Sequence, residues 1–188
     1  IAVLLAAHNG LEWIDEQLES IFRQESIEFE IFISVDCSID NTLKWCEALA
    51  VKDSRVRVLA SVGRFGGAAK NFFRLMHYVD FSNFDYVSFS DQDDIWLPDK
   101  LRRAHEMLLR TGADAYSSNV VAFWPDGRQL TIEKFQPHQR WAFLFAVAGP
   151  GCTYVMRKVL ACALQAVVKN RWAEVQQVGL AYLFAYAL

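Results

Sequence analysis

The stretch YVSFSDQDDIWLPDK, residues 86–100, joins a buried strand directly to a cluster of acids. Tyr86–Phe89 has the composition of a buried β-strand, and Asp91, Asp93 and Asp94 follow it closely. Three carboxylates this close repel one another unless a cation offsets their charge. Hard oxygen ligands of this kind suit Mg²⁺ or Mn²⁺. We therefore predict a divalent-metal site at the end of this strand, with Asp91 and Asp93 as its ligands.

A solvated acidic loop is the alternative interpretation of the same stretch. In that case Asp94 or Asp99 would only cap the helix that begins near Pro98 and continues to about Arg110. We assign the capping role to Asp99. For Asp91 and Asp93 we favour the metal, because the preceding strand and the following Trp96 fix the position of the loop.

Outward from this stretch, apolar runs with strand spacing alternate with runs at helical spacing. The predicted strands are Ala2–Ala7, Glu30–Val35, Arg55–Ala60, Tyr86–Phe89 and Ala115–Phe123, the last followed by a hairpin turn at Pro125–Arg128. The predicted helices are Leu11–Phe22, a segment capped by Asp40 that includes Leu43 and Leu49, and Ala68–Tyr78. This alternation predicts an α/β fold with a mostly parallel sheet, whose ligands gather at the carboxyl ends of the strands.

Polar residues follow the first two predicted strands. Asp36 comes directly after the second strand, where it can accept hydrogen bonds from a base or a ribose, whereas Asp40 is better explained as a helix cap. The loop Ala7–Asn9, with His8 at its centre, offers backbone groups and two small polar side chains at the same edge. We therefore expect Asp36 and this loop to share one binding crevice.

The segment GRFGGAAKN, residues 63–71, is a glycine-rich turn that contains Arg64 and Lys70. It fits neither GxxxxGK[ST] nor GxGxxG, so the sequence supports neither a P-loop nucleotide hydrolase nor a dinucleotide enzyme. Lys70 either contacts a phosphate group or is a solvated lysine in a flexible turn, and the residues leave both interpretations open.

The composition indicates one globular domain over residues 1–188. The chain is 53% hydrophobic and 22% charged, and its net charge of −3 provides no basic field for nucleic acid. Its longest apolar stretches, Trp141–Met156 and Val178–Leu188, are too short or too interrupted to span a membrane. Both ends lie inside apolar runs, so we expect a fragment of a longer protein.

The chain has four cysteines: Cys37, Cys46, Cys152 and Cys162. Their spacing does not match that of a metal-binding motif, so we expect them to be free thiols in a reducing cytoplasm.

Four segments, LLAAHNG, SVDCSIDNT, GRFGGAAKNF and FSDQDDIWLPDKL, occur in the order and spacing typical of family 2 glycosyltransferases with the GT-A fold. The serine followed by DQDD and an aromatic residue resembles the bacterial rhamnosyltransferase-like branch, as does GPGCTYVMRK, residues 149–158. The resemblance implies a Rossmann-like GT-A domain. Residues 1–110 would form its nucleotide-sugar-binding half and residues 111–188 its acceptor side.

The resemblance also implies roles for particular residues. Ala7, His8 and Asn9 match the loop that packs along the base, and Asp36 matches the residue that recognises it. Asp91 and Asp93 match the DxD pair, with Asp93 the direct ligand of Mn²⁺ or Mg²⁺ and Asp91 nearer the ribose and the metal. Lys70, which could contact a phosphate group, is a further candidate for binding the nucleotide-sugar donor. The family usually has two adjacent aspartates followed by glycine after the second strand, where this chain has Val35, Asp36 and Cys37.

The catalytic base is the weakest part of the match. This branch usually supplies it from an acidic motif beyond the position of Lys158, and Glu174 is the one carboxylate between Val159 and Leu188. Glu174 is therefore the candidate base, with a solvated helix residue as the alternative. Phe135, Trp141, Phe143 and Phe145 are candidates for an acceptor platform or a membrane-proximal surface, or they pack in the core.

Three functions are consistent with the sequence. The first is a metal-dependent, inverting transfer of a sugar, with rhamnose as a candidate, from a nucleoside diphosphate sugar to a hydroxyl of a surface-glycan acceptor. A lipid-linked saccharide acceptor would place the protein in the cytoplasm, in peripheral contact with the inner membrane. The second is a nucleotide-sugar-binding module with impaired catalysis. The third, a nucleotidyltransferase, is disfavoured because the loop AAHNG lacks a basic signature.

Overall fold

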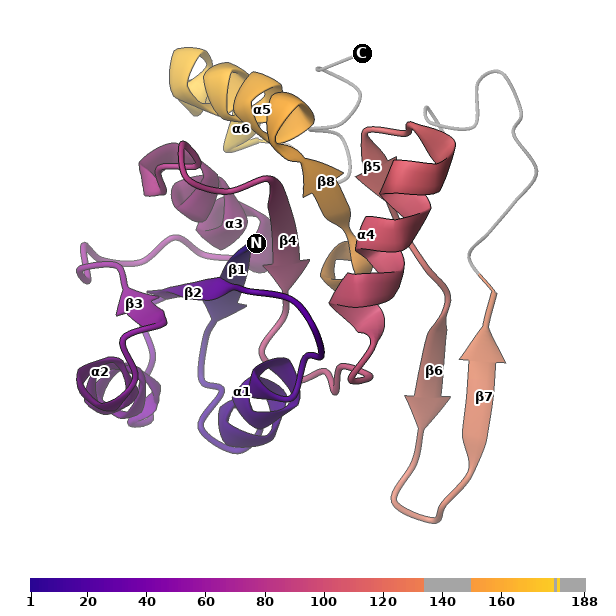
Figure 1. The fold of residues 1–188 in the computed structure, drawn as a ribbon. Coiled ribbons are helices and arrows are strands. Elements are labelled where there is room, and N and C mark those ends of the chain that lie inside the picture. Colours follow the sequence, from indigo (N-terminus) through magenta and orange to yellow (C-terminus); the bar gives the residue numbers. More distant parts are fainter. Residues whose placement is uncertain (134–149, 178, 180–188) are drawn as a thin grey trace.

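The computed structural model describes residues 1–133, 150–177 and 179. A six-stranded sheet forms its centre, with the strand order β3-β2-β1-β4-β8-β5 (Figure 1). The strands are β1 (Ala2–Ala7), β2 (Glu30–Val35), β3 (Val56–Val58), β4 (Tyr86–Ser90), β5 (Ala115–Tyr116), β6 (Val120–Phe123), β7 (Gln129–Ile132) and β8 (Val155–Arg157). The helices are α1 (Ile14–Phe22), α2 (Thr42–Lys52), α3 (Ala68–Tyr78), α4 (Lys100–Thr111), the 3-10 turn η2 (Gly151–Thr153), α5 (Lys158–Asn170) and α6 (Trp172–Val175).

The sheet is mostly parallel, as predicted. β1 pairs in parallel with both β2 and β4, so that Leu5 lies opposite Ile33 on one side and Ser90 on the other. β8 runs antiparallel to its neighbours β4 and β5. The carboxyl ends of β1, β2 and β4 therefore lie together at one edge of the sheet.

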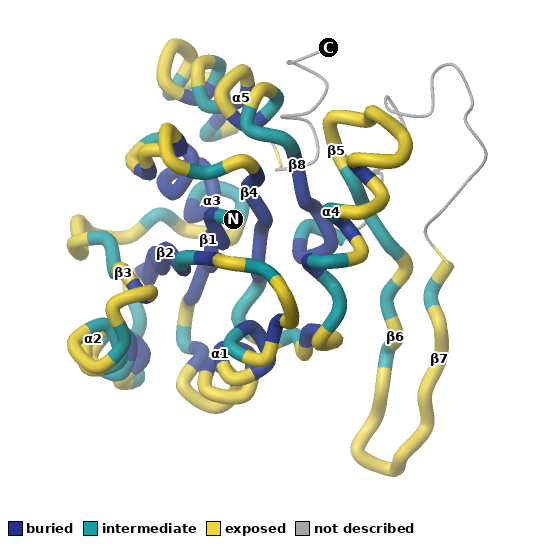
Figure 2. Tube along the Cα trace, in the orientation of Figure 1, coloured by how far each residue is buried: buried dark blue, intermediate teal, exposed yellow. Residues whose placement is uncertain are grey.

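Two hydrophobic layers cover the two faces of this sheet. β1 alternates between them: Leu4 packs in the layer with α3 and α5, and Leu5 packs in the layer with α1 and α4. Figure 2 shows the central strands buried along their length, as expected for parallel strands with helices on both faces. Because both faces of β1 and β4 are packed, the loops at their ends have little freedom to move with respect to one another.

The predicted strand Ala115–Phe123 is wrong as a single element. The structure divides it into β5, at the edge of the central sheet, and β6, which pairs with β7 in a separate two-stranded sheet. The predicted turn is confirmed: it closes this hairpin, with Gly127 at a φ of 86° and a hydrogen bond of 3.0 Å from Trp124 N to Arg128 O. The hairpin lies outside the main body in Figure 1.

Two smaller predictions concern helix caps. Asp40 accepts hydrogen bonds from Thr42 N (3.0 Å) and Leu11 N (3.1 Å), which confirms a structural role near the start of α2. The N-cap position itself belongs to Asn41, so the predicted cap was wrong by one residue. Asp99 occupies the N-cap position of α4 but makes no capping hydrogen bond, so that part of the prediction is wrong. Its carboxylate instead faces Arg102 and Arg103, at 3.7 and 3.8 Å.

The four cysteines are free thiols, as predicted. In the part of the chain that the structure describes, we find no helix with the length and apolarity that crossing a membrane requires.

Candidate functional site

A pocket of about 420 Å³ opens at the carboxyl ends of β1, β2 and β4. It is lined by residues 6–8, 36, 64, 66–68, 71 and 91–93. Of the residues that the sequence singled out for the donor and the metal, Ala7, His8, Asp36, Asp91 and Asp93 line this pocket. The topology therefore brings together side chains that lie up to 86 positions apart in the chain.

The loop after β1 is bound to the loop after β4. Gln92 accepts a hydrogen bond from His8 N (2.7 Å) and donates one from Nε2 to His8 O (2.9 Å). A Cβ atom at Gly10 would meet the amide end of Gln92, so a larger residue there would have to displace this side chain from its present position. Gln92 was not predicted as a site residue, because the carboxylates beside it in the DQDD segment carried the signal.

Asn9 connects the loop after β1 to the loop after β2. It has a positive φ of 47°, accepts a hydrogen bond from Ile39 N at Oδ1 (2.8 Å) and donates its own N–H to Ser38 Oγ (3.0 Å). Asn9 does not line the pocket, and neither does Lys70. The structure gives Asn9 a loop-positioning role, and the donor contacts expected of both residues stay predictions.

Asp36 is buried at the rear of the pocket, with 4% of its surface exposed. Oδ1 accepts hydrogen bonds from Cys37 N and Phe65 N (both 2.7 Å), and Oδ2 accepts one from Gly66 N (2.8 Å). Burial alone would raise the pKa of Asp36, but these backbone donors outweigh it and hold the pKa below its usual value. Asp36 therefore fixes the glycine-rich turn against β2 and remains ionised.

Asn71 is a pocket residue that the sequence analysis did not select. It is buried on α3, and its Nδ2 donates to Ala7 O (3.1 Å) and Ser34 O (2.9 Å), which joins the ends of β1 and β2. Its Oδ1 is buried without a hydrogen-bond partner. The available signal was an amide among the buried residues of α3, which are apolar apart from Asn71 and Arg74.

The acidic loop after β4 divides its carboxylates between two environments. Asp91 and Asp93 line the pocket, whereas Asp94 does not. Burial, followed by repulsion from Asp94 and Asp93, raises the pKa of Asp91 to about 6, although Cys152 N donates a hydrogen bond to it. A cation in the pocket would remove this repulsion, and two hard carboxylates open to the pocket fit Mg²⁺ or Mn²⁺.

Asp94 belongs to an inner cluster that includes Cys152 on η2. Ligand atoms of Asp91, Asp94 and Cys152 lie within 4.8 Å of one another, a spacing that would also suit a metal. However, burial and the nearby Asp94 raise the pKa of the Cys152 thiol, which donates a hydrogen bond to Asp94. Mg²⁺ and Mn²⁺ also prefer hard oxygen ligands to sulfur. We therefore favour Asp91 and Asp93 as the metal-binding pair.

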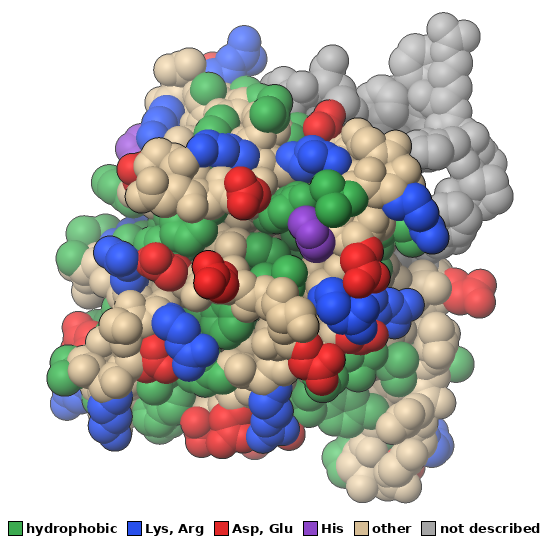
Figure 3. Space-filling model, viewed as in Figure 1, with side chains coloured by type: hydrophobic (Ala, Val, Ile, Leu, Met, Phe, Trp, Pro, Cys, Tyr) green, Lys and Arg blue, Asp and Glu red, His purple; other side chains and the backbone are tan. Residues whose placement is uncertain are grey.

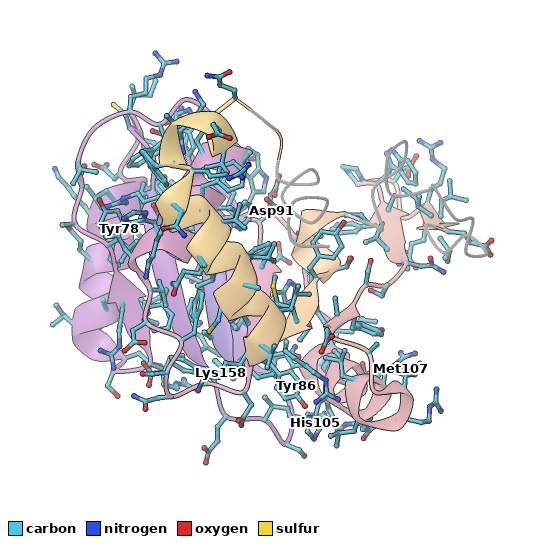
Figure 4. The ribbon with its side chains drawn as sticks, turned by 90° about the horizontal axis from the view of Figure 1, so that it is seen from above. Tyr78, Tyr86, Asp91, His105, Met107 and Lys158 are labelled. Atoms are coloured by element: carbon cyan, nitrogen blue, oxygen red, sulfur yellow. The ribbon has the colours of Figure 1, made fainter. Side chains whose placement is uncertain are left out.

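A second hollow, of about 330 Å³, lies at the opposite edge of the sheet, beside Tyr86, His105 and Lys158. Figure 4 shows these three residues well away from Asp91. The Lys158 ammonium donates to Ser82 O, and the Tyr86 hydroxyl lies 3.0 Å from His105 Nδ1. Because these polar groups already have protein partners, the first pocket is the better candidate for a functional site.

Glu174, the candidate base, does not reach the pocket. It lies on α6 with 64% of its side chain exposed, and its Oε2 is 3.6 Å from Nη1 of Arg171. The aromatic residues Phe135, Trp141, Phe143 and Phe145 lie outside the described residues. On the face seen in Figure 3, acidic and basic side chains are interspersed, without a broad patch of one sign.

The chain is similar in sequence to known glycosyltransferases. The profile described as Glycosyl transferase family 2 matches residues 2–163. A dTDP-rhamnosyl transferase, RfbG of Shigella flexneri, is 44% identical over 184 residues, which is 97% of this chain and 64% of that protein. The chain thus spans 64% of the length of this relative.

Solved structures share the fold. Residues 1–349 of TarS from S. aureus, in complex with UDP-GlcNAc, superpose with a TM-score of 0.65 at 21% identity, covering 90% of this chain and 46% of that one. The mannosyltransferase PcManGT from Pyrobaculum calidifontis, in complex with GDP-Man and Mn²⁺, gives a TM-score of 0.55 at 18% identity, covering 86% and 46%. These likenesses confirm the predicted GT-A type of fold.

Proposed function

Because the chain belongs to glycosyl transferase family 2, we propose that it transfers a sugar, with rhamnose as the first candidate, from a nucleoside diphosphate donor to a hydroxyl of a surface glycan. The observation that carries the proposal is that one pocket is lined by Asp36, Asp91 and Asp93 together. The name of the 44% identical relative supports dTDP-rhamnose as the donor to test first.

Each side of the pocket offers chemistry for a different part of the donor. The side made by Ala7, His8 and Asp36 offers backbone groups and a carboxylate to a base and ribose. Arg64, from the glycine-rich turn, lines the same pocket and offers a guanidinium to a diphosphate. The donor would therefore lie across the ends of β2, β1 and β4, with its sugar toward the acidic loop.

Asp91 and Asp93 would hold Mn²⁺ or Mg²⁺ in this proposal. When bound, such an ion supplies Lewis-acid stabilisation for the negative charge that develops on a departing nucleoside diphosphate. Asp91 and Asp93 line the pocket, and Asp36 holds the glycine-rich turn that carries Arg64. These residues thus position the diphosphate before any bond breaks.

An inverting transfer requires a base on the face of the sugar opposite the leaving group, within hydrogen-bond reach of the acceptor hydroxyl. Asp36, Asp91 and Asp93 are the carboxylates that line the pocket within the described residues, and all three have other roles in the proposal. Glu174 stays the sequence-based candidate, although the structure leaves it exposed outside the pocket. The acceptor side of the site is thus less defined than the donor side.

We further propose that the acceptor is a lipid-linked saccharide, which would place the reaction at the cytoplasmic face of the inner membrane. Support comes from the family and from the name of a relative in Escherichia coli, 26% identical over 159 residues, which describes a glucosyltransferase acting on a diphosphoundecaprenol-linked sugar. Acceptor identity can be tested separately from the donor, because hydrolysis of the donor does not need the acceptor.

The experiment is a donor panel for the full-length protein. dTDP-rhamnose, UDP-glucose, UDP-N-acetylglucosamine and GDP-mannose are each incubated with and without Mn²⁺, and release of nucleoside diphosphate is measured. We expect release from one donor, dependent on the metal. Release of pyrophosphate from a nucleoside triphosphate would instead identify a nucleotidyltransferase, and nucleotide binding without turnover on any donor and acceptor would identify a binding module.

A further inference from the structure

The glycine-rich turn, residues 63–67, supplies Arg64, Gly66 and Gly67 to the pocket. Gly63 and Gly66 have positive φ values of 114° and 82°. Within the described residues, a Cβ atom at either position would meet no other part of the chain within 4 Å. Glycines in open space leave a segment many accessible conformations. The position of the turn therefore depends on the contacts that other elements make with it.

One anchor holds the backbone of the turn, and a second holds a side chain. Asp36, at the end of β2, accepts hydrogen bonds from Phe65 N (2.7 Å) and Gly66 N (2.8 Å). From α3, Arg74 places its guanidinium over the Phe65 ring, with 4.9 Å between Cζ and the ring centre, in a cation-π contact. Phe65 is thus held by its backbone from β2 and by its ring from α3.

Arg74 is itself fixed in place, with 3% of its surface exposed. Nη1 donates to Ser34 Oγ on β2 (2.8 Å), and Nη2 donates to Ala60 O in the segment between β3 and the turn. The centre of the Tyr78 ring lies 6.0 Å from Cζ. The guanidinium therefore joins β2, the segment that leads to the turn, and the turn itself.

A buried arginine without a carboxylate partner is costly, because the charge loses its hydration without gaining an opposite charge. Within the described part of the chain, Arg74 takes part in no ion pair, and its Nε is buried without a hydrogen-bond partner. An apolar side chain would fill the same space at a lower cost. Packing of α3 against the sheet therefore does not by itself account for an arginine at this position.

We propose that Arg74 is a positioning residue for donor binding: its buried guanidinium holds the Phe65 ring and, with it, the turn that carries Arg64. The inference rests on the proposed function only in assigning the pocket and Arg64 to the diphosphate of the donor. Without Arg74, Asp36 would hold the turn by its backbone alone, and Arg64 would sample several positions at the pocket.

The test compares Arg74→Met, Phe65→Leu and the double variant with the wild-type full-length protein. Arg103→Met, at an exposed position on α4, is the matched control. Hydrogen exchange of the protein without metal or nucleotide is followed by mass spectrometry in peptides that cover the turn and in peptides that cover β1. Binding of dTDP in the presence of Mn²⁺ is measured by calorimetry.

We expect Arg74→Met to speed hydrogen exchange in the turn by about tenfold relative to exchange in β1, because the turn is released while the sheet stays folded. Phe65→Leu should give a smaller increase. The double variant should exchange no faster than Arg74→Met, because the two side chains act through one contact. The dissociation constant of dTDP should rise by about fivefold in Arg74→Met, since the turn then occupies its binding position for only a fraction of the time. Arg103→Met should match the wild type in both measurements.

Three results would overturn the inference. Exchange in the turn of Arg74→Met that rises no more than exchange in β1 would mean that the arginine stabilises only the fold as a whole. An increase in the double variant equal to the product of the two single increases would mean that Arg74 does not act through Phe65. Faster exchange in the turn with unchanged binding of dTDP would remove the link to the donor.

If Arg74→Met does not fold, Phe65→Leu decides by the first and third of these results, with the same peptides and the same nucleotide. If the wild type does not bind dTDP, the donor named in the proposed function fails instead. In that case the exchange of the nucleotide-free proteins still tests whether Arg74 holds the turn.

Discussion

The loops after β2 and after β4 both present aspartates at the same edge of the sheet. The protein stabilises the charged carboxylate in the first loop and disfavours it in the second. Asp36, after β2, accepts three backbone hydrogen bonds, and its pKa is held low. Asp91, after β4, is crowded by burial and by two neighbouring carboxylates, and its pKa is raised to about 6. The same residue type is therefore satisfied by backbone donors in one loop and crowded by burial and by like charges in the other.

This difference separates two kinds of function. A carboxylate with its hydrogen bonds supplied by backbone N–H groups fixes a loop and costs nothing further to keep ionised. Carboxylates that repel one another store unfavourable electrostatic energy, which a bound divalent cation relieves. The first arrangement fixes the shape of the pocket, and the second is the one to which our proposal assigns the metal and the diphosphate.

The largest expected effect tests the loop after β4. Asp93→Asn removes a metal ligand from the pocket, so we expect kcat/KM with the active donor to fall by about 10³-fold, since the developing charge loses its stabilisation. Thermal unfolding of the metal-free variant should stay unchanged or occur at a higher temperature, because the substitution relieves repulsion. Asp15→Asn, at an exposed position of α1, is the matched control and should leave kcat/KM as it is. Full activity of Asp93→Asn would exclude the proposed metal pair.

The next effect tests the loop after β2. Asp36→Asn places an amide N–H group against a backbone N–H of the glycine-rich turn, so we expect a loss of about 1–3 kcal/mol in unfolding free energy and a donor KM raised by about tenfold or more. The pKa of Asp36 is lowered in the folded protein, so its ionised form stabilises the fold above the ordinary value of 3.8 and this contribution is lost as the pH falls through the folded pKa. Denaturant unfolding should therefore show the wild-type advantage in full at pH 7 and a smaller one below about pH 4. An advantage that did not change with pH would assign the effect to shape rather than to charge.

A smaller effect tests the scaffold that both loops share. Asn71→Ala removes the amide that joins Ala7 O to Ser34 O and leaves two buried carbonyls with one donor fewer, which should cost about 1–3 kcal/mol of unfolding free energy. Donor KM should rise by less than it does for Asp36→Asn, since the loop after β2 keeps its own hydrogen bonds. Asn41→Ala, at an exposed position whose side chain makes no capping hydrogen bond, is the control for denaturant unfolding. An equal loss in both variants would mean that Asn71 does not join the strands.

The fold was largely predictable because its signals are local. The apolar runs that form β1, β2 and β4 are buried along nearly all their length, and the helix predicted at Ala68–Tyr78 has these bounds in the structure. The division of residues 115–123 between two sheets was not predictable in this way. β5 pairs with β8, about 40 positions later in the chain, and local periodicity carries no information on so distant a partner.

In the candidate site, too, the local signals were predictable and the contacts between distant segments were not. Strand ends predicted the positions of Asp36, Asp91 and Asp93, because parallel strands bring their carboxyl ends to one edge. The inward role of Asp94 was not predictable, since it depends on Cys152, which the antiparallel strand β8 brings beside β4. A lysine at the start of a helix also looks solvated in the sequence, and only packing against Trp96 shows that Lys100 is buried.

The smallest expected effect concerns Glu174, which contrasts with both loops. Its carboxylate is mostly exposed, lies on the four-residue helix α6, and faces Arg171 across 3.6 Å, an arrangement that contributes little to stability in water. We therefore expect Glu174→Gln to keep kcat and donor KM within about twofold of the wild type, since an exposed carboxylate outside the pocket cannot take a proton from an acceptor bound within it. Glu12→Gln, at another exposed position, controls for the loss of one surface charge. A large fall in kcat with an unchanged donor KM would instead make Glu174 the base, and it would require the acceptor side of the site to extend from the pocket to α6.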